Sequence, residues 1–169
     1  RNNPDFPWCW DGIGRNPNIS IDFIVTNLDK NWNWYNISSN PAITMDMIND
    51  NPQLPWDFIA VSVNPNLTLQ LVLSNLDENW DWVRISCNSA VTLDMIINYN
   101  QLPWNWKGMS SNINITVDFF YDFVHKNWNW YCVSKNPVIT MDMIINNPQL
   151  PWDWDGVRFN PNVTIEVIE

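Results

Sequence analysis

Tryptophan is the residue type whose spacing here most suggests chemistry, because exposed indole rings can stack on sugars or bases. All thirteen Trp of the 169-residue chain fall into two columns of a 24-residue period. The first column holds Trp8, Trp32, Trp56, Trp80, Trp104, Trp128 and Trp152, and the second holds Trp10, Trp34, Trp82, Trp106, Trp130 and Trp154. Phe58 is the single exception in the second column. Two large rings in so short a repeat are more typical of a core than of a binding platform, so we predict that they pack inside.

A column of acidic residues repeats with the same period and could line up as a cation-binding row. It holds Asp22, Asp46, Gln70, Asp94, Asp118, Asp142 and Glu166. A hard cation needs several convergent oxygen ligands, whereas each repeat supplies one carboxylate. Each of these residues follows a Ser or Thr by two positions, and we interpret it as a first-turn helix residue placed where the helix dipole favours an acid.

The other reactive side chains do not form a catalytic pattern. His125 is the single histidine, and no third residue completes a triad with it and Cys132. Cys9, Cys87 and Cys132 occupy three different positions of the repeat, which is not the spacing of a disulfide framework. No phosphate-binding loop, dinucleotide-binding, nucleophile-elbow or zinc motif is present. We therefore predict no catalytic, cofactor-binding or metal-binding residues and no enzymatic activity.

The 24-residue period divides the chain into seven repeats. Their boundaries are 3–26, 27–50, 51–74, 75–98, 99–122, 123–146 and 147–169, the last being incomplete. An unbroken Asn column consists of Asn16, Asn40, Asn64, Asn88, Asn112, Asn136 and Asn160. A Ser/Thr column consists of Ser20, Thr44, Thr68, Thr92, Thr116, Thr140 and Thr164. We predict a single repeat array over residues 1–169, and we expect it to be a segment of a longer array.

A second period of 48 residues distinguishes odd from even repeats. Odd repeats read "PQLPW" or close to it before the first Trp, whereas even repeats read "LDKNW", "LDENW" and "VHKNW". Asn occurs in odd repeats at Asn18, Asn66, Asn114 and Asn162, where even repeats have Ala42, Ala90 and Val138. Neighbouring repeats are therefore predicted to lie in alternating environments, or to descend from a duplicated two-repeat block.

Five glycosylation sequons accompany this pattern. They begin at Asn18, Asn36, Asn66, Asn114 and Asn162. Four of the five arise because the repeat places Ser or Thr two residues later, where a helix cap is expected. A glycan at any of them requires a secretory route that the sequence does not indicate.

Short helices are the favoured reading of each repeat. Asn-Pro marks turns, because the residue before proline avoids the helical region. Thr44 before "MDMIND" predicts an N-cap for the second element. Pro55 before "WDFIAVS" predicts the start of the first element, where even repeats place Asn31, Asn79 or Asn127 as the cap. We predict an all-α solenoid of seven helix-hairpin repeats with helices of seven or eight residues, which must stack because they are too short to be stable alone.

A β-solenoid with 24-residue coils is the alternative. "NLTLQLVL" and "NVTIEVIE" alternate apolar and polar residues, which is typical of strands. The unbroken Asn column could also form an Asn ladder in such a fold. Met, Asp and Asn in "TMDMIIN" and the adjacent prolines disfavour a central strand.

Composition narrows the classes of partner. Hydrophobic residues make up 46% of the chain, which suits a folded domain, and there is no apolar run long enough to span a membrane. The net charge of −10 disfavours nucleic acid and anionic membrane surfaces as partners, since both require clustered Lys and Arg. Proteins, or further copies of the chain in a filament or homo-oligomer, remain as expected partners.

The units "NPQLPWDW" and "NPVITMDMI" together resemble the tandem repeats N-P-x-I-T-W-x-I and N-P-x-x-P-W-x-W of long, uncharacterised proteins of giant DNA viruses of amoebae. The resemblance covers the whole chain. It implies a viral repeat protein, virion-associated or located in the infected host cell, and it brings no catalytic residues. The chain departs from the pattern after Thr, where it has Met, Leu, Ile or Val, and even repeats lack the proline before Trp.

The function predicted from these observations is a structural or interaction scaffold that binds proteins or assembles end to end. One alternative is a carbohydrate- or ligand-binding module that uses exposed Trp. A second alternative is a secreted glycoprotein coat component, which would use the sequons.

Overall fold

The computed structural model describes residues 7–163, and these residues form thirteen short helices with no strand among them. Each repeat contributes a first helix that begins at or next to the second Trp column. A second helix follows the Ser/Thr column. The prediction of an all-α solenoid of very short helices is confirmed, and the β-solenoid alternative is wrong. The alternation in "NLTLQLVL" was misleading because the stretch contains a helix over Leu69–Ser74, of which Leu71 and Val72 are buried, and a buried Leu67 that precedes the helix.

The first helices have four to six residues each. They are α1 (Trp10–Gly14), α3 (Trp34–Ser38), α5 (Phe58–Val61), α7 (Trp82–Cys87), α9 (Trp106–Met109), α11 (Trp130–Lys135) and α13 (Trp154–Val157). The second helices have six residues each and are α2 (Ile21–Thr26), α4 (Met45–Asp50), α6 (Leu69–Ser74), α8 (Leu93–Asn98), α10 (Val117–Asp122) and α12 (Met141–Asn146). The second helix expected in the seventh repeat, with Thr164 and Glu166, lies outside the described residues.

The second helices begin as the sequence predicts. The hydroxyl of Thr44 accepts a hydrogen bond from the Met47 amide, and Asp46 lies in the first turn. The same cap is made by Ser20, Thr68, Thr92 and Thr140. Thr116 is the N-cap residue of α10 but makes no side-chain cap bond.

The first helices begin later than predicted and are shorter. Pro55 does not start α5, and Asn31, Asn79 and Asn127 do not cap the corresponding helices of even repeats. The N-cap lies two residues further on, where the side chains of Asn33, Asp57, Asn105, Asn129 and Asp153 each accept a backbone N–H three residues later.

A turn precedes the first helix where the sequence predicts its start. The Trp56 amide donates to the Leu54 carbonyl at 2.8 Å, so Pro55 lies at the centre of a three-residue turn that suits its fixed φ. The Trp56 indole donates to the Asn51 carbonyl at 2.9 Å and fixes the ring against the preceding turn.

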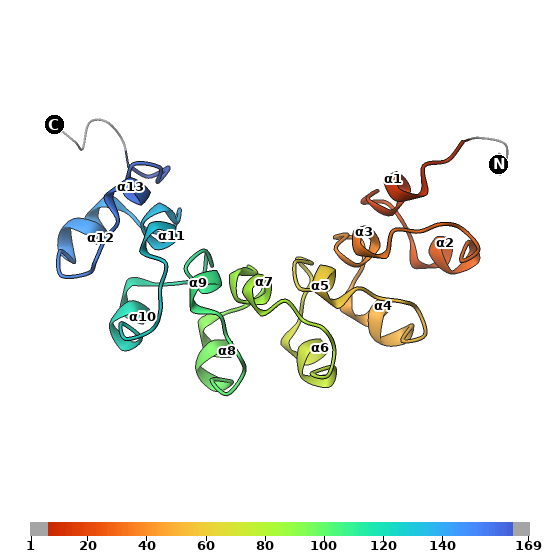
Figure 1. The fold of residues 1–169 in the computed structure, drawn as a ribbon, viewed down its shortest axis with the longest axis horizontal. Coiled ribbons are helices and arrows are strands. Elements are labelled where there is room, and N and C mark those ends of the chain that lie inside the picture. Colours follow the sequence, from red (N-terminus) through yellow and green to blue (C-terminus); the bar gives the residue numbers. More distant parts are fainter. Residues whose placement is uncertain (1–6, 164–169) are drawn as a thin grey trace. The chain divides into compact units, whose positions relative to one another are not determined.

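The chain divides into two compact units, residues 1–81 and 82–169. In the first unit, α1, α3 and α5 lie in one row and α2, α4 and α6 in another (Figure 1). The second unit repeats this arrangement with α7, α9, α11 and α13 in one row and α8, α10 and α12 in the other (Figure 1). Fully buried side chains lie between the rows, among them Ile24, Ile43 and Leu71 in the first unit and Ile96, Phe120 and Ile139 in the second.

Helices this short depend on their neighbours, because a single turn cannot offset the cost of nucleating a helix. Stability must therefore come from the contacts between successive repeats. Over residues 7–163, no helix has both the length and the apolar character needed to cross a bilayer.

Candidate functional site

The two aromatic columns meet at the junctions between consecutive repeats. The second-column ring of one repeat packs against the first-column ring of the next, with centroids 5.0–5.7 Å apart and ring planes crossing at 75–90°. The pairs are Trp10 with Trp32, Trp34 with Trp56, Phe58 with Trp80, Trp82 with Trp104, Trp106 with Trp128, and Trp130 with Trp152. This geometry places the positive edge of one ring on the negative face of the other.

The polar edge of the first-column rings is used inside the protein. From Trp32 to Trp152, each indole N–H donates to the backbone carbonyl five residues earlier at 2.7–2.9 Å. A platform for sugars needs accessible ring faces. Among the described residues, only Trp8 and Trp154 are exposed Trp side chains, at 49% and 65%.

The Asn column joins each repeat to the one before it. Asn112, which is fully buried, donates through its side-chain amide to the carbonyls of Ser86, Asn88 and Val91 at 3.0–3.2 Å. Its side-chain oxygen accepts the Asn114 amide at 2.8 Å, which closes the local turn. The Asn112 side chain therefore closes a local turn through its oxygen and links two repeats through its amide.

The Asn column makes more bonds in odd repeats than in even ones. Asn64, Asn112 and Asn160 each donate to three carbonyls of the preceding repeat. Asn40 and Asn136, in even repeats, each donate to two. The 48-residue Asn column adds further bonds in odd repeats: Asn66 reaches the carbonyls of Pro41 and Ile43, and Asn114 those of Ser89 and Val91.

A buried Ser column also joins successive repeats, and the sequence reasoning missed it. Its members are Ser38, Ser62, Ser86, Ser110 and Ser134. Each hydroxyl accepts the backbone N–H nineteen residues later, at 2.9–3.0 Å, from the residue that follows the first-column Trp. The 24-residue spacing of these serines was available as a signal, but Gly14 and Arg158 replace them in the first and last repeats.

Two kinds of interface follow from the alternation. We define the tight interface as the contact of repeats 2 with 3, 4 with 5 and 6 with 7, into which Leu54, Leu102 and Leu150 are buried. The open interface is that of repeats 1 with 2 and 5 with 6, where the same position holds Lys30 and Lys126; repeat 4 has Glu78 at this position. Neighbouring repeats thus differ in their surroundings, which agrees with the first of the two explanations offered for the 48-residue period.

Small residues in odd repeats allow the close approach at the tight interface. A Cβ atom on Gly108 in α9 would lie 2.4 Å from the Val83 carbonyl oxygen of α7. One on Gly156 in α13 would lie 2.5 Å from the Tyr131 carbonyl oxygen of α11. Gly12, at the same position in repeat 1, has only Cys9 within 4 Å.

At the open interface, lysines cover the aromatic rings. The Lys30 ammonium lies 5.9 Å from the Trp10 ring centroid, and the Lys126 ammonium lies 5.2 Å from that of Trp106. A positive charge over an indole face is attracted by the ring quadrupole. Lys30 also donates a hydrogen bond to Asp29, and this bond lowers the pKa of the Asp29 carboxyl group below its usual value.

The acidic column and the reactive side chains are spread over the molecule. Asp22, Asp46, Asp94, Asp118 and Asp142 are exposed in the first turns of their helices. Within residues 7–163, no three His, Cys, Asp or Glu residues gather in a way that could hold a metal ion. His125 is exposed, and the three cysteines are free thiols.

The sequon asparagines have different surroundings. Asn18 is exposed, whereas Asn36 is buried and donates to the Asp11 carboxylate at 2.6 Å. The amides of Asn66, Asn114 and Asn162 donate to carbonyls of the preceding repeat. A glycan would replace one of the two amide hydrogens, so at Asn66 and Asn114 it would remove one of the two bonds.

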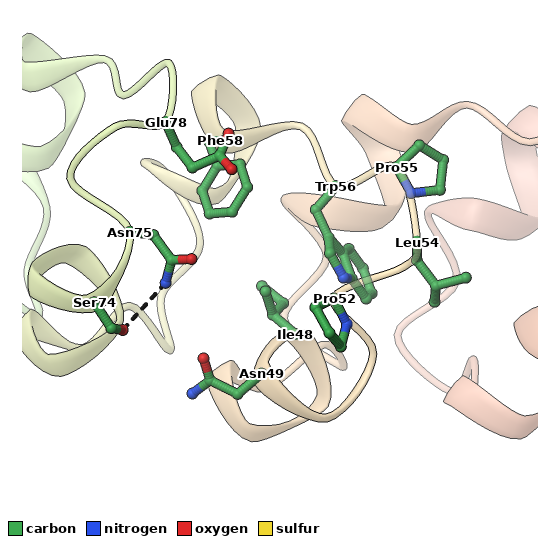
Figure 2. A pocket seen from close by; sticks show the side chains of 10 residues that line it. All are labelled: Ile48, Asn49, Pro52, Leu54, Pro55, Trp56, Phe58, Ser74, Asn75 and Glu78. Atoms are coloured by element: carbon green, nitrogen blue, oxygen red, sulfur yellow. Dashed lines mark hydrogen bonds between the residues drawn. The ribbon is translucent and has the colours of Figure 1, made fainter.

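A pocket of about 420 Å³ opens at Phe58, the position where the second aromatic column lacks a Trp. Its apolar wall consists of Ile48, Pro52, Leu54, Pro55 and Trp56, and its other side of Asn49, Phe58, Ser74, Asn75 and Glu78 (Figure 2). A related hollow of about 300 Å³ at Trp152 and Trp154 uses the equivalent residues four repeats later.

No family model, curated protein or solved structure matches this chain.

Proposed function

We propose that this protein is a non-enzymatic structural and interaction scaffold, a helical repeat array that binds proteins or assembles end to end with further copies of itself. The observation that carries the proposal is the use of the repeated residues. The Trp, Asn and Ser columns are committed to contacts between successive repeats, so the regularity of the sequence is accounted for by the construction of the array. What differs between repeats is left for recognition.

The charge of the chain supports proteins as partners. The net charge of −10 gives the array a negative field that attracts basic proteins and raises their association rate. A virion-associated location, implied by the resemblance to viral repeat proteins, is compatible with such a scaffold and belongs to the same proposal.

The exposed ring of Trp154 supports self-assembly. Trp154 is a second-column ring that is 65% exposed, whereas Trp130, in the same column, packs edge-to-face against Trp152. Packing of Trp154 against an aromatic ring of another molecule, head to tail, would repeat this T-shaped contact. Such a head-to-tail contact gives filaments unless the rotation closes a ring.

Sedimentation velocity over micromolar to millimolar concentrations tests the assembly. We expect the mean mass to rise with concentration and the rise to be lost in Trp154→Lys. Trp130→Lys is not a suitable control because Trp130 packs inside, so Val124→Lys, at an exposed apolar position, serves instead. A chain that remains monomeric throughout this range would exclude end-to-end assembly and leave protein binding as the function to be tested.

A further inference from the structure

The pocket at Phe58 is best understood by comparison with two other pairs of repeats, in which a lysine of one repeat covers the aromatic ring of the repeat before it. Lys30 covers Trp10 and Lys126 covers Trp106, and each of these lysines follows its ring by twenty residues. The corresponding pair in repeats 3 and 4 is Phe58 and Glu78. Repeat 3 thus lacks the large ring, and repeat 4 lacks the cation and has a carboxylate at its position.

The walls of this pocket suit a long side chain with a positive end. Glu78 and Phe58 lie together on one side, and Pro52, Ile48 and Trp56 lie on the other (Figure 2). Among residues 7–163, no ion pair or hydrogen bond engages the Glu78 carboxylate, and no Lys or Arg lines the pocket. An acid beside an aromatic face attracts an ammonium group from both directions.

We propose that this pocket binds a lysine side chain of a basic protein partner. The inference rests on the scaffold function and names the chemistry of its partner. The ammonium group would lie over Phe58 and pair with Glu78, and the methylene stem would lie against Ile48, Pro52 and Trp56, as lysine stems do on apolar surfaces. The partner's lysine would thereby occupy the place that Lys30 and Lys126 fill within the chain itself.

Charge and shape both favour this occupant. The chain carries −10 overall, so a basic segment is attracted before it reaches the pocket. The volume of about 420 Å³ lies within the range of about 300–1,000 Å³ that is usual for ligand pockets and is ample for one extended side chain. Lysine is preferred over an uncharged chain because only the charged end satisfies Glu78.

A titration with a short peptide of alternating Gly and Lys tests the proposal, with the same peptide acetylated on every lysine as the ligand control. Binding is followed by calorimetry and by the methyl resonance of Ile48, which lines the pocket. We expect the lysine peptide to bind and shift Ile48, and the acetylated peptide to do neither. Equal binding of the two peptides, or an unmoved Ile48 resonance, would overturn the proposal.

Glu78→Lys is the sharpest variant because it supplies the internal lysine of repeats 2 and 6. We expect this variant to bind the lysine peptide about tenfold or more weakly, because the ion pair with Glu78 is lost and the new lysine fills the cation site. Asp122→Lys changes the net charge equally at an exposed position that does not line the pocket, and should weaken binding by about twofold or less through the general field. Equal losses in the two variants would show a general charge effect and refute the pocket.

Glu78→Gln removes the charge with little change of shape and covers the case in which Glu78→Lys does not fold. The affinity of this variant for the lysine peptide should also fall, and the thermal unfolding curve of the free variant should match that of the unchanged protein. Failure of the peptide tests would leave the sedimentation result untouched, so the lysine pocket and the scaffold function can fail separately.

Discussion

The tight and open interfaces share the aromatic, Ser and Asn columns but differ in the number of Asn bonds and in the residues packed beside them. At the tight interface, odd repeats contribute a small residue in the first helix, a buried Leu and two Asn columns that together make five bonds to the preceding repeat in repeat 5. At the open interface, Asn136 makes two such bonds, and Lys126 covers Trp106 where Leu would otherwise be buried.

The comparison shows how one kind of repeat can both build the array and leave positions free to vary for recognition. The shared columns set the spacing of the array, whereas the alternating positions decide how closely neighbours approach. The tight interface brings the backbones of successive first helices close together at Gly108 and Gly156. The open interface has a ring covered by an exposed charge, and in repeats 3 and 4 that cover is missing. Variation for recognition can therefore arise at the open interface without disturbing the tight one.

The largest predicted effect is on the Asn column. Asn112→Ala should lower the free energy of unfolding by about 3–5 kcal/mol, because buried carbonyls of Ser86 and Asn88 lose their donor. Asn136→Ala, at the open interface, should cost about 1 kcal/mol less because it removes one bond fewer. Urea unfolding measures both.

The control is Asn16→Ala, since Asn16 is exposed and its described side-chain bond is the local one from the Asn18 amide. It should cost about 1 kcal/mol or less. If Asn16→Ala proved as costly as Asn112→Ala, the links between repeats would not be the source of stability.

The sequence was sufficient to predict the columns and the second helices. A Trp or Asn that recurs at a fixed spacing is visible in one dimension, and Thr44 followed by Asp46 is a local capping signal. The first helices were harder, because Pro55 and Asn31 are good starting residues by local rules. In the structure a three-residue turn lies at Pro55, and the indole of the following Trp donates to the carbonyl five residues earlier.

The candidate site could be predicted only in part. The 48-residue period predicted alternating environments, but which interface is tight depends on a backbone approach, that of Gly108 to the Val83 carbonyl. To predict the pocket, one would have had to know that residues twenty apart in the sequence, such as Lys126 and Trp106, are in contact. Once that contact is known, the sequence shows that Phe58 and Glu78 occupy the same two positions but are neither a Trp nor a Lys.

The next largest effect is expected at the small residues of the tight interface. Gly108→Ala should destabilise the protein by about 1–3 kcal/mol, because the new Cβ would meet the Val83 carbonyl oxygen and overpack the interface. A Cβ on Gly12 would make only ordinary van der Waals contact with Cys9, so Gly12→Ala should stabilise by about 0.5–1 kcal/mol, since Ala is the better helix former. Thermal unfolding measures the change in stability of each variant, and the prediction requires the two changes to have opposite signs. Ala60, at the same position in repeat 3, shows that α5 accommodates a Cβ against repeat 2.

Serine substitutions test what the two interfaces share. Ser134→Ala, at the tight interface, and Ser110→Ala, at the open one, each leave one backbone N–H without its acceptor. Both should cost about 1–2 kcal/mol, equal to within about 0.5 kcal/mol. A clear difference between them in urea unfolding would mean that the Ser column belongs to the alternation and not to the common frame.

The smallest effect is expected where repeats 3 and 4 are converted to the pattern of repeats 1 and 2. The double variant Phe58→Trp with Glu78→Lys restores the larger ring opposite Trp80 and places a cation over it, as in Trp10 and Lys30. The added cation–π contact and buried ring surface should stabilise the protein by about 0.5–1 kcal/mol. Each single variant should gain less than half of this, because the ring and the cation act together. Additive effects in this double-mutant cycle would show that positions 58 and 78 do not act together. A loss of stability in the double variant would show that Phe58 and Glu78 are already matched to each other. The pocket would then be a settled feature of the array's own packing and not a position left open for a partner.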